Sequence, residues 1–345
     1  MNEITQPESG VRFKHVLAFE VSKATLVTKV LPSGKESTIP NTKASVRRLI
    51  EKESKANAGL GMGPLLVICE ATGSYDRHIL EEACDQGIAC HRAHGSRMRA
   101  YARYRGVTAK TDAIDVRLIA DFGRDTPDLG MWKKPTAAQE DLRALVARRS
   151  ELDQGLGAER ARLEHTRNKV VAASINRQIK AIAKEIANIE AELERLVAET
   201  EQLDTDTRLM RSVIGIGFIS AIAIRAYLPE LGTIGRGAIA ALAGLAPYDD
   251  ASGAHDGLRH IKGGRGEARQ ALYMAAVVGM THNPHFKDLA ERIKAKGRPR
   301  KVAIVAVMRK LLTILNAILR DQKPCKMTAA ARQDRKGPAE TPILA

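Results

Sequence analysis

The chain has 345 residues, which is enough for two or three domains with a sizeable core. It carries 55 Lys and Arg against 40 Asp and Glu, and the net charge of +15 favours an anionic polymer, above all nucleic acid, as partner. No apolar run approaches the roughly 20 residues of a membrane-spanning helix, and the N-terminus has no apolar signal core, so a cytoplasmic protein without a membrane partner is expected. The four cysteines form no CxxC pair and are expected to be buried or free thiols.

Residues 15–130 predict an α/β domain that follows a loose arm at residues 1–14. Two β-branched runs in HVLAFEVSKATLVTKVL meet at Ser22–Lys23, which favours a hairpin. A helix in TKASVRRLIEKES, a buried strand in GPLLVICEATG, a helix in DRHILEEACDQG and a strand in IACHRA follow. The last helix is expected to run from Asp112 to Gly123. This alternation of strands and helices is typical of the α/β class.

A long helical hairpin is predicted for residues 136–204. Its start is marked by GMWKKPTAAQ, in which Thr136 and Gln139 can form a capping box. Apolar residues then recur at gaps of three and four, most regularly from Ile175 to Leu196, and this spacing is typical of a heptad seam. An ordinary hairpin packed on its own domain and a projecting antiparallel coiled coil that contacts a second subunit both fit the pattern. We favour the coiled coil.

Residues 206–321 predict a mostly helical third part. The stretch LMRSVIGIGFISAIAIRAYL suggests a helix-hairpin-helix, in which the Gly217 amide could hold a DNA phosphate without reading sequence. A Gly turn between two core helices would look the same. A glycine-rich loop, GLAPYDDASGAHDGLRHIKGGRG, precedes three further helices, and the polar tail at residues 322–345 is expected to be disordered.

Four acids stand out against the basic background. Asp112 and Asp115 share one face of a helix, although acids at a helix start can also be a solvated first turn. Glu20 lies in an apolar strand, where a carboxylate is costly unless it is paired or bound to metal, and Glu70 ends another buried strand. Acids in this order are the arrangement of an RNase H-like domain that holds Mg²⁺ for phosphoryl transfer.

A basic segment, HRAHGSRMRAYARYRGVTAK, comes just before the last helix of this domain. It is predicted to contact a nucleic-acid backbone, although a solvated basic helix would have the same composition. The residues concerned are Arg97, Arg99, Arg103, Arg105 and Lys110, with Tyr101 and Tyr104 between them. Farther along, Ser252 lies in DDASGAHDG, where spacing alone indicates only a turn, and no GxSxG elbow of a hydrolase is present.

Together these blocks resemble the four-acid (DEDD) transposases of insertion-sequence family 110, which include the Piv-type DNA invertases. CEATGSY, KTDAIDVRLIA, LAGLAPYDDASG, GGRGEARQALYMAA, NPHF and RKVAIVAVMRKLLTILNAIL carry the resemblance, which covers about residues 15 to 321. It implies a RuvC-like domain with Mg²⁺ at Glu20, Glu70, Asp112 and Asp115, and a C-terminal transposase domain. In that second domain the serine nucleophile of the family corresponds to Ser252, which would form a covalent phosphoserine link to DNA.

The same resemblance implies several partners. They are donor and target DNA, a noncoding bridge RNA that pairs with both, and further copies of the chain in a dimer or tetramer. The serine would act beside the acids of another subunit, and a bacterial, nucleoid-associated location follows. Arg265 and Arg269, just downstream, could clamp the phosphate.

One position departs from the family pattern, which has Asp where this chain has Glu20 in FEVSK. Glu is longer by one methylene, roughly 1.5 Å, and Mg²⁺ tolerates little geometric error. Two alternatives therefore stay open beside an active recombinase. One is a RuvC-like nuclease that hydrolyses branched DNA, with Ser252 only structural. The other is a decayed transposase that binds RNA and DNA without chemistry.

Overall fold

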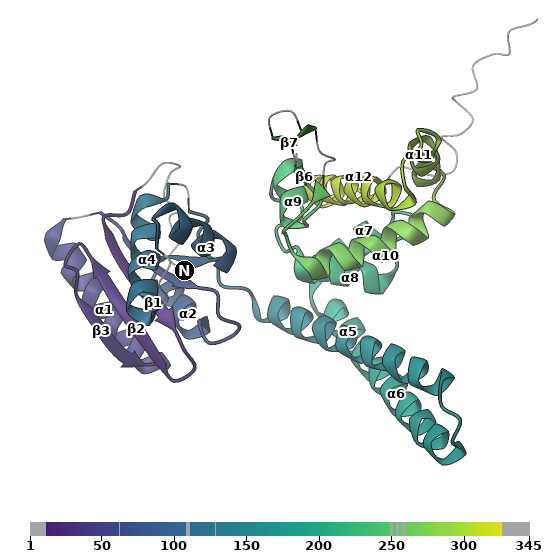
Figure 1. The fold of residues 1–345 in the computed structure, drawn as a ribbon, viewed down its shortest axis with the longest axis horizontal. Coiled ribbons are helices and arrows are strands. Elements are labelled where there is room, and N and C mark those ends of the chain that lie inside the picture. The colour runs from purple at the N-terminus through teal and green to yellow at the C-terminus, as the bar shows by residue number, and fades with distance from the viewer. Residues whose placement is uncertain are drawn as a thin grey trace, which may run out of the picture. The chain divides into compact units, whose positions relative to one another are not determined.

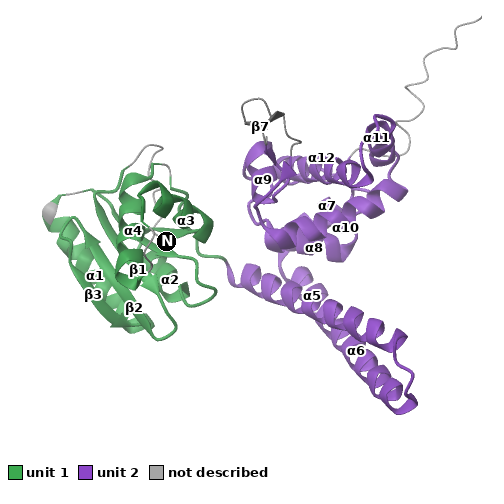
Figure 2. Ribbon diagram, in the orientation of Figure 1, with its two compact units in different colours: residues 1–135 green, residues 136–345 purple. Residues whose placement is uncertain are grey.

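The computed structural model describes residues 12–61, 63–107, 111–127, 129–248, 251–252, 255–256 and 260–325. The chain divides into two compact units, residues 1–135 and 136–345 (Figure 2), which are taken in turn. Most of the expected arm and tail therefore lies outside the described residues.

Unit 1 is built on a five-stranded mixed sheet in the order β3-β2-β1-β4-β5 (Figure 1). The strands are β1 (His15–Val21), β2 (Thr25–Leu31), β3 (Glu36–Pro40), β4 (Leu65–Glu70) and β5 (Ala89–Ala93). The first three form an antiparallel meander, and β4 and β5 run parallel to β1. The predicted hairpin at Ser22–Lys23 is confirmed, and this mixed sheet is consistent with a RuvC-like domain.

Helices cover both faces of the sheet, because the strand residues alternate between two apolar cores. Leu17 and Phe19 pack toward α1 (Lys43–Leu60) and α2 (Arg77–Asp85). Val16 and Ala18 pack on the opposite face, under α3 (Gly95–Tyr104) and α4 (Asp112–Asp125). Successive strand side chains point to opposite faces, so each residue of β1 can be assigned to a layer by its parity.

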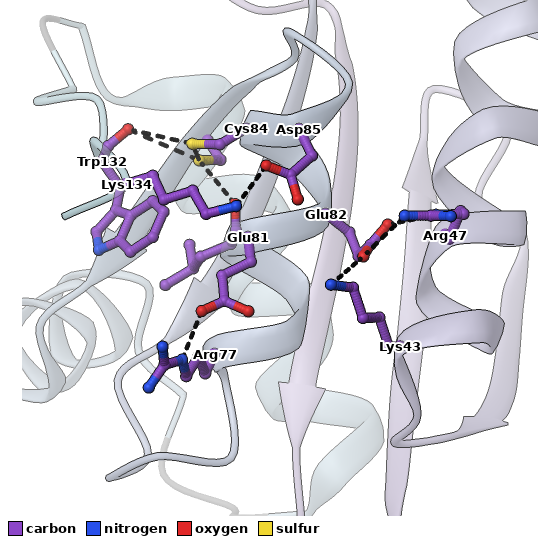
Figure 3. A network of polar contacts seen from close by, with 11 residues as sticks. Lys43, Arg47, Arg77, Glu81, Glu82, Cys84, Asp85, Trp132 and Lys134 are labelled. Carbon is purple, nitrogen blue, oxygen red and sulfur yellow. Dashed lines mark hydrogen bonds and ion pairs between the residues drawn. The ribbon is translucent and has the colours of Figure 1, made fainter. Parts of the chain in front are cut away.

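A polar network links α1 and α2, the helices on one face of the sheet (Figure 3). The Glu82 side chain of α2 is fully buried, and Arg47 Nε of α1 donates to it at 2.8 Å. Nearby, Cys84 Sγ and Cys90 Sγ lie 3.6 Å apart beside the Trp132 carbonyl. All four cysteines are free, as expected. Through these contacts at its carbonyl, Trp132 attaches the end of unit 1 to the sheet.

Unit 2 begins with the predicted helical hairpin, formed by α5 (Ala137–Glu164) and α6 (Lys169–Glu199) (Figure 1). The capping box of Thr136 and Gln139 is present. Burial is most complete at the base, where Leu142 and Leu193 belong to one core cluster. Farther out, Ile175 and its seam neighbours are half-buried, because two helices cover only one side of such a seam. A projecting coiled coil that contacts a second subunit stays a prediction.

The rest of unit 2 is a helical bundle around one core. Its helices are α7 (Glu201–Arg211), α8 (Phe218–Tyr227), α9 (Arg236–Leu242), α10 (Gly266–His282), α11 (Pro284–Ala295) and α12 (Arg300–Asp321). The expectation that no stretch is apolar enough to cross a membrane was wrong by length and composition, since α12 is such a helix. Its apolar side chains, among them Val307, Leu311 and Leu315, fill the core of the bundle. The hydropathy of α12 therefore reflects burial within the protein.

Candidate active site at the carboxyl edge of the sheet

Glu20 and Glu70 end adjacent parallel strands at neighbouring positions. Phe19 pairs with Cys69 in the register of β1 and β4, so the next residue of each strand is one of the two acids. Both acids share the parity of Ala18 and Ile68, which belong to the core under α3 and α4. The two carboxylates therefore lie on the α4 side of the sheet, and each residue is half-buried.

Two contacts fix the direction of α4 across this face. At its end, a Cβ built on Gly123 would lie 3.2 Å from the side chains of Val16 and Leu66, near the beginnings of β1 and β4. Two turns earlier, Arg117 Nε donates at 2.8 Å to Glu36 Oε1, and Glu36 pairs with Lys29 in the β2–β3 register. The helix therefore begins toward the carboxyl ends of β1 and β4.

This direction brings the second pair of acids to the same edge. Asp115 lies eight residues before Gly123, about 12 Å along a helix, and Glu20 lies four residues beyond Val16, about 13 Å along a strand. Asp112 and Asp115 also continue the stripe that buries Ile119 against the sheet. Sheet register and helix direction are consistent with the predicted gathering of four acids from three elements, which stays a prediction.

The acidic edge has the donors of a metal site in an open arrangement. Asp112 is exposed and Asp115 is half-buried. No three His, Cys, Asp or Glu side chains among the described residues are positioned to hold an ion, so the carboxylates would have to turn toward a shared one. Gly95 leaves room for this, because a Cβ there would lie 2.8 Å from Glu70 Oε1. Carboxylate oxygens fit a hard divalent cation.

The basic segment forms α3, beside the acidic edge. Arg99 Nη1 and Glu70 Oε1 both lie near Gly95, at 3.4 and 2.8 Å from the same Cβ position, so this arginine neighbours the acids. Arg97 is exposed, with its guanidinium carbon 5.3 Å from the centroid of the Phe122 ring. Arg103 is exposed in the last turn of the helix. Of the three, Arg99 presents positive charge next to Glu70, as expected for a polyanion site, whereas Arg103 lies near Tyr101 and Arg105, which contact the other end of α4.

Arg105 differs from its neighbours because acids of α4 engage it. Its guanidinium lies 3.3 Å from both Asp121 and Asp125, and it donates to the Tyr101 hydroxyl at 2.8 Å. Burial and the hydrogen bond to Asp125 raise the pKa of Tyr101 to about 12, so this hydroxyl stays protonated. DNA contact by Arg105 would require exchange of these ion pairs. Lys110 lies outside the described residues.

Ser252 lies in unit 2, in the loop between α9 and α10. This loop contains the short strands β6 (Pro247–Tyr248), β7 (Ala251–Ser252), β8 (His255–Asp256) and β9 (His260–Ile261). The backbone of Ser252 pairs with that of His255, and its side chain lies outside the description. The loop also contains β6 paired with β9, so its two ends run side by side.

Arg265 and Arg269 lie where this loop returns to the bundle, and both are engaged within the chain. Arg265 donates to both carboxylate oxygens of Glu230 at 2.6 Å and to the Tyr227 carbonyl at 2.9 Å. Arg269 Nη1 donates to the Gly263 carbonyl at 2.7 Å. Sequence spacing pointed to these two arginines but missed Glu230, which lies 35 residues before Arg265.

Gly217 lies directly before the first residue of a helix, as predicted. It is the N-cap of α8, after a turn that begins at the end of α7. Gly215 in that turn has φ of +104°, and a Cβ there would lie 2.6 Å from Gly279 Cα of α10. The glycine spacing therefore has a packing role at Gly215, while phosphate contact at Gly217 stays a prediction.

A mixed sheet with acids at its carboxyl edge and arginines beside them defines a class of proteins that act on the phosphodiester backbone of nucleic acids. Comparison with known sequences shows which family within this class the chain resembles. Residues 21–166 match the DEDD transposase domain of the IS110 family, and residues 207–291 match the family described as "Transposase IS116/IS110/IS902 family". Glu20 lies immediately before the first matched range.

Two relatives extend the match across most of the chain. Pilin gene-inverting proteins of Moraxella lacunata and Moraxella bovis are each 30% identical over 272 residues, which is 75% of this chain and 81% of theirs. The chain belongs to the IS110 family of transposases. Its class of activity is accordingly DNA recombination and transposition.

Proposed function

We propose that the protein cuts and rejoins DNA of a mobile element through a covalent phosphoserine intermediate at Ser252, with Mg²⁺ at Glu20, Glu70, Asp112 and Asp115. The observation that carries the proposal is that Glu20 and Glu70 end neighbouring strands at one edge of the sheet, toward which α4 begins with Asp112 and Asp115. The four acids come from two strands and one helix, on the face that α4 covers. Such a donor set suits phosphoryl transfer at a divalent ion.

Each group in the proposal has a defined role. Mg²⁺, when bound, activates an attacking oxygen and stabilises a leaving one. The four acids would hold the ion, and Arg97, Arg99 and Arg103 would neutralise the phosphates that flank the scissile one. A serine hydroxyl is a weak nucleophile unless it is activated, so Ser252 depends on the acidic edge for its reactivity.

The proposed step exchanges one phosphoester for another. Ser252 Oγ bonds to phosphorus while the bond from phosphorus to the deoxyribose oxygen breaks. The serine proton leaves to a base, and the released deoxyribose oxygen takes up a proton. Attack on the phosphoserine by a hydroxyl of the second DNA reverses these changes and joins donor to target without net hydrolysis.

We further propose that a noncoding bridge RNA selects both DNAs by base pairing, with the protein in a dimer or tetramer in the cytoplasm. The net charge of +15 supports a polyanionic partner. In RNA-guided enzymes the protein grips backbone and shape, while pairing reads sequence. Arginines on the exposed face of α3 suit that division of labour.

A denaturing-gel assay for a protein–DNA adduct tests the proposal. It uses purified protein, Mg²⁺, labelled junction DNA and RNA transcribed from the sequence that flanks the reading frame. Ser252→Ala and Asp112→Ala should each lower adduct formation by on the order of 1000-fold, because catalytic groups that act as a unit fail together. Thermal melting of both variants should stay close to wild type, since Asp112 is exposed.

The products distinguish the alternatives. An adduct that both variants lose supports the serine recombinase, and omission of the RNA tests the guide. Cleavage without an adduct, unchanged in Ser252→Ala, would indicate a hydrolytic nuclease. Bound DNA and RNA without any strand cleavage would indicate a decayed binding protein.

A further inference from the structure

The loop that carries Ser252 leaves and re-enters the helical bundle through a neck of three glycines. Gly244, Gly263 and Gly264 all have φ near +70°, in the region that side chains rarely adopt. A Cβ on Gly264 would lie 2.1 Å from Gly244 N, and one on Gly244 would lie 2.2 Å from the Gly263 carbonyl oxygen. The two ends of the loop are therefore packed backbone against backbone.

Apolar and backbone contacts hold both sides of the neck. Leu245 is buried in the core of unit 2, and the partly buried Ile261 packs against the same core. Arg265 N donates to the Leu242 carbonyl at 2.7 Å, across the neck from α10 to α9. Outside it, β6 and β9 pair Pro247 with Ile261. The loop thus has a fixed base on the bundle.

Two arginines fasten this base with charged hydrogen bonds. The guanidinium of Arg265 makes a two-pronged contact with Glu230, and a third donor reaches the Tyr227 carbonyl. Arg269 holds the Gly263 carbonyl inside the neck. Burial alone would raise the pKa of Glu230, but the hydrogen bond and charge of Arg265 outweigh it and keep this carboxyl ionised. Bidentate pairs of this kind fix geometry as well as charge.

We propose that Glu230, Arg265 and Arg269 are positioning residues, a latch that holds the base of the Ser252 loop closed so that the nucleophile stays in register. The inference rests on the proposed role of Ser252. In this inference Arg265 and Arg269 hold the base of the loop. Their place in the sequence had suggested a different role, contact with the DNA phosphate. A misplaced reacting group can cost on the order of 100-fold in rate, so even a small opening of the neck should lower the rate of adduct formation.

Substitution of Glu230 distinguishes the two candidate roles of Arg265, contact with DNA and closure of the latch. If Arg265 clamped DNA, Glu230→Gln would free its guanidinium, and DNA affinity would stay the same or rise without loss of rate. If the pair is a latch, the same variant lowers the rate of adduct formation about 10- to 100-fold at unchanged DNA affinity. Arg265→Lys adds a second distinction, because lysine keeps a phosphate contact but loses the fork that grips Glu230.

The experiment measures hydrogen exchange in peptides from residues 245–262 of the full-length protein, together with single-turnover adduct formation and DNA affinity. Glu230→Gln and Arg265→Lys should both raise exchange in this segment about tenfold. Exchange in α12 should stay at the wild-type level. Glu192→Gln, which removes an exposed pair with Arg195 on α6, is the matched control and should change none of the three measurements.

Unchanged exchange in residues 245–262 of both variants would overturn the latch, as would a loss of DNA affinity in Arg265→Lys that accounts for the lower rate. Failure of the proposed function has a different signature. In that case wild type forms no serine adduct, while the latch variants still open the loop in hydrogen exchange.

Discussion

Glu20 is the proposed metal ligand at which this chain departs from the family pattern, which has aspartate there. The longer side chain starts from the end of β1, directly beside Glu70. We expect Glu20→Asp to retain recombination and Glu20→Ala to lower it by on the order of 1000-fold, since removal of one metal ligand disables the group.

Strand cleavage over a Mg²⁺ titration would measure both variants. A shorter ligand should shift the metal concentration needed for half-maximal cleavage without loss of the product. Full activity in Glu20→Ala would show that this carboxylate is not a ligand, and loss of cleavage in Glu20→Asp would contradict the expectation that aspartate can replace it.

Gly95 offers a test of the acidic edge that leaves every acid in place. It lies in the first turn of α3, where alanine is a better helix former than glycine. The added Cβ would lie 2.8 Å from Glu70 Oε1, so the Glu70 carboxylate must turn away. Gly95→Ala should therefore melt no lower than wild type yet cleave DNA about tenfold more slowly.

The control for this substitution is Gly59→Ala, in α1, where no atom lies within 4 Å of the added Cβ. It should leave cleavage unchanged. Equal cleavage rates in Gly95→Ala and wild type would mean that the room beside Gly95 for the Glu70 carboxylate has no part in catalysis.

Among the elements, α4 delivers two of the four acids, and an ion pair at the sheet edge helps to anchor it. Hydrogen bonds from Arg117 and Lys29 lower the pKa of Glu36 from 4.5 to about 2. A carboxyl with a depressed folded-state pKa stabilises the fold above its ordinary pKa and loses this contribution as the pH falls. The anchor should therefore be present at neutral pH and fade in acid.

Glu36→Gln tests this by thermal melting across pH. The melting temperature should fall relative to wild type near neutral pH, and the difference should shrink as the pH drops from 4.5 toward 2. High salt should also reduce it, since the pair is exposed to solvent. Glu194→Gln, on the exposed face of α6, serves as the control with a flat response. A difference that persists unchanged in acid would contradict the ion-pair explanation.

Most elements could be predicted from the periodic spacing of apolar residues, because burial of one face of an element imposes that spacing. The strands β1, β2, β4 and β5 and the long helices were all evident from apolar spacing. The strand β3 was missed, since ESTIP lies at the sheet edge with no fully buried residue and so lacks an apolar signature. The four acids could be singled out from their places in the expected strands and last helix, but their side of the sheet could not be derived, because it depends on strand register and helix direction. Glu230 and Asp121 were missed as arginine partners for the same reason, since long-range ion pairs leave no local pattern.

At the scale of the whole molecule, the proposed chemistry uses acids of unit 1 and a serine of unit 2. Family resemblance predicts that the two come from different subunits. Ser252→Ala and Asp112→Ala proteins, each inactive alone, should then regain adduct formation when they are mixed. One site in the mixed oligomer would join intact acids from the first variant to an intact serine from the second. If both groups came from one chain, every site in the mixture would carry a defect.

Complementation would be measured as adduct per mixed dimer, after co-refolding or co-expression so that subunits exchange. A mixed dimer has one intact site of two, so recovery to about half of the wild-type level per mixed dimer is the ceiling. The adduct should form only on the Asp112→Ala chain, which a size tag on that variant would reveal on the gel. Adduct on neither chain, with mixed oligomers present, would show that acids and serine act within one subunit.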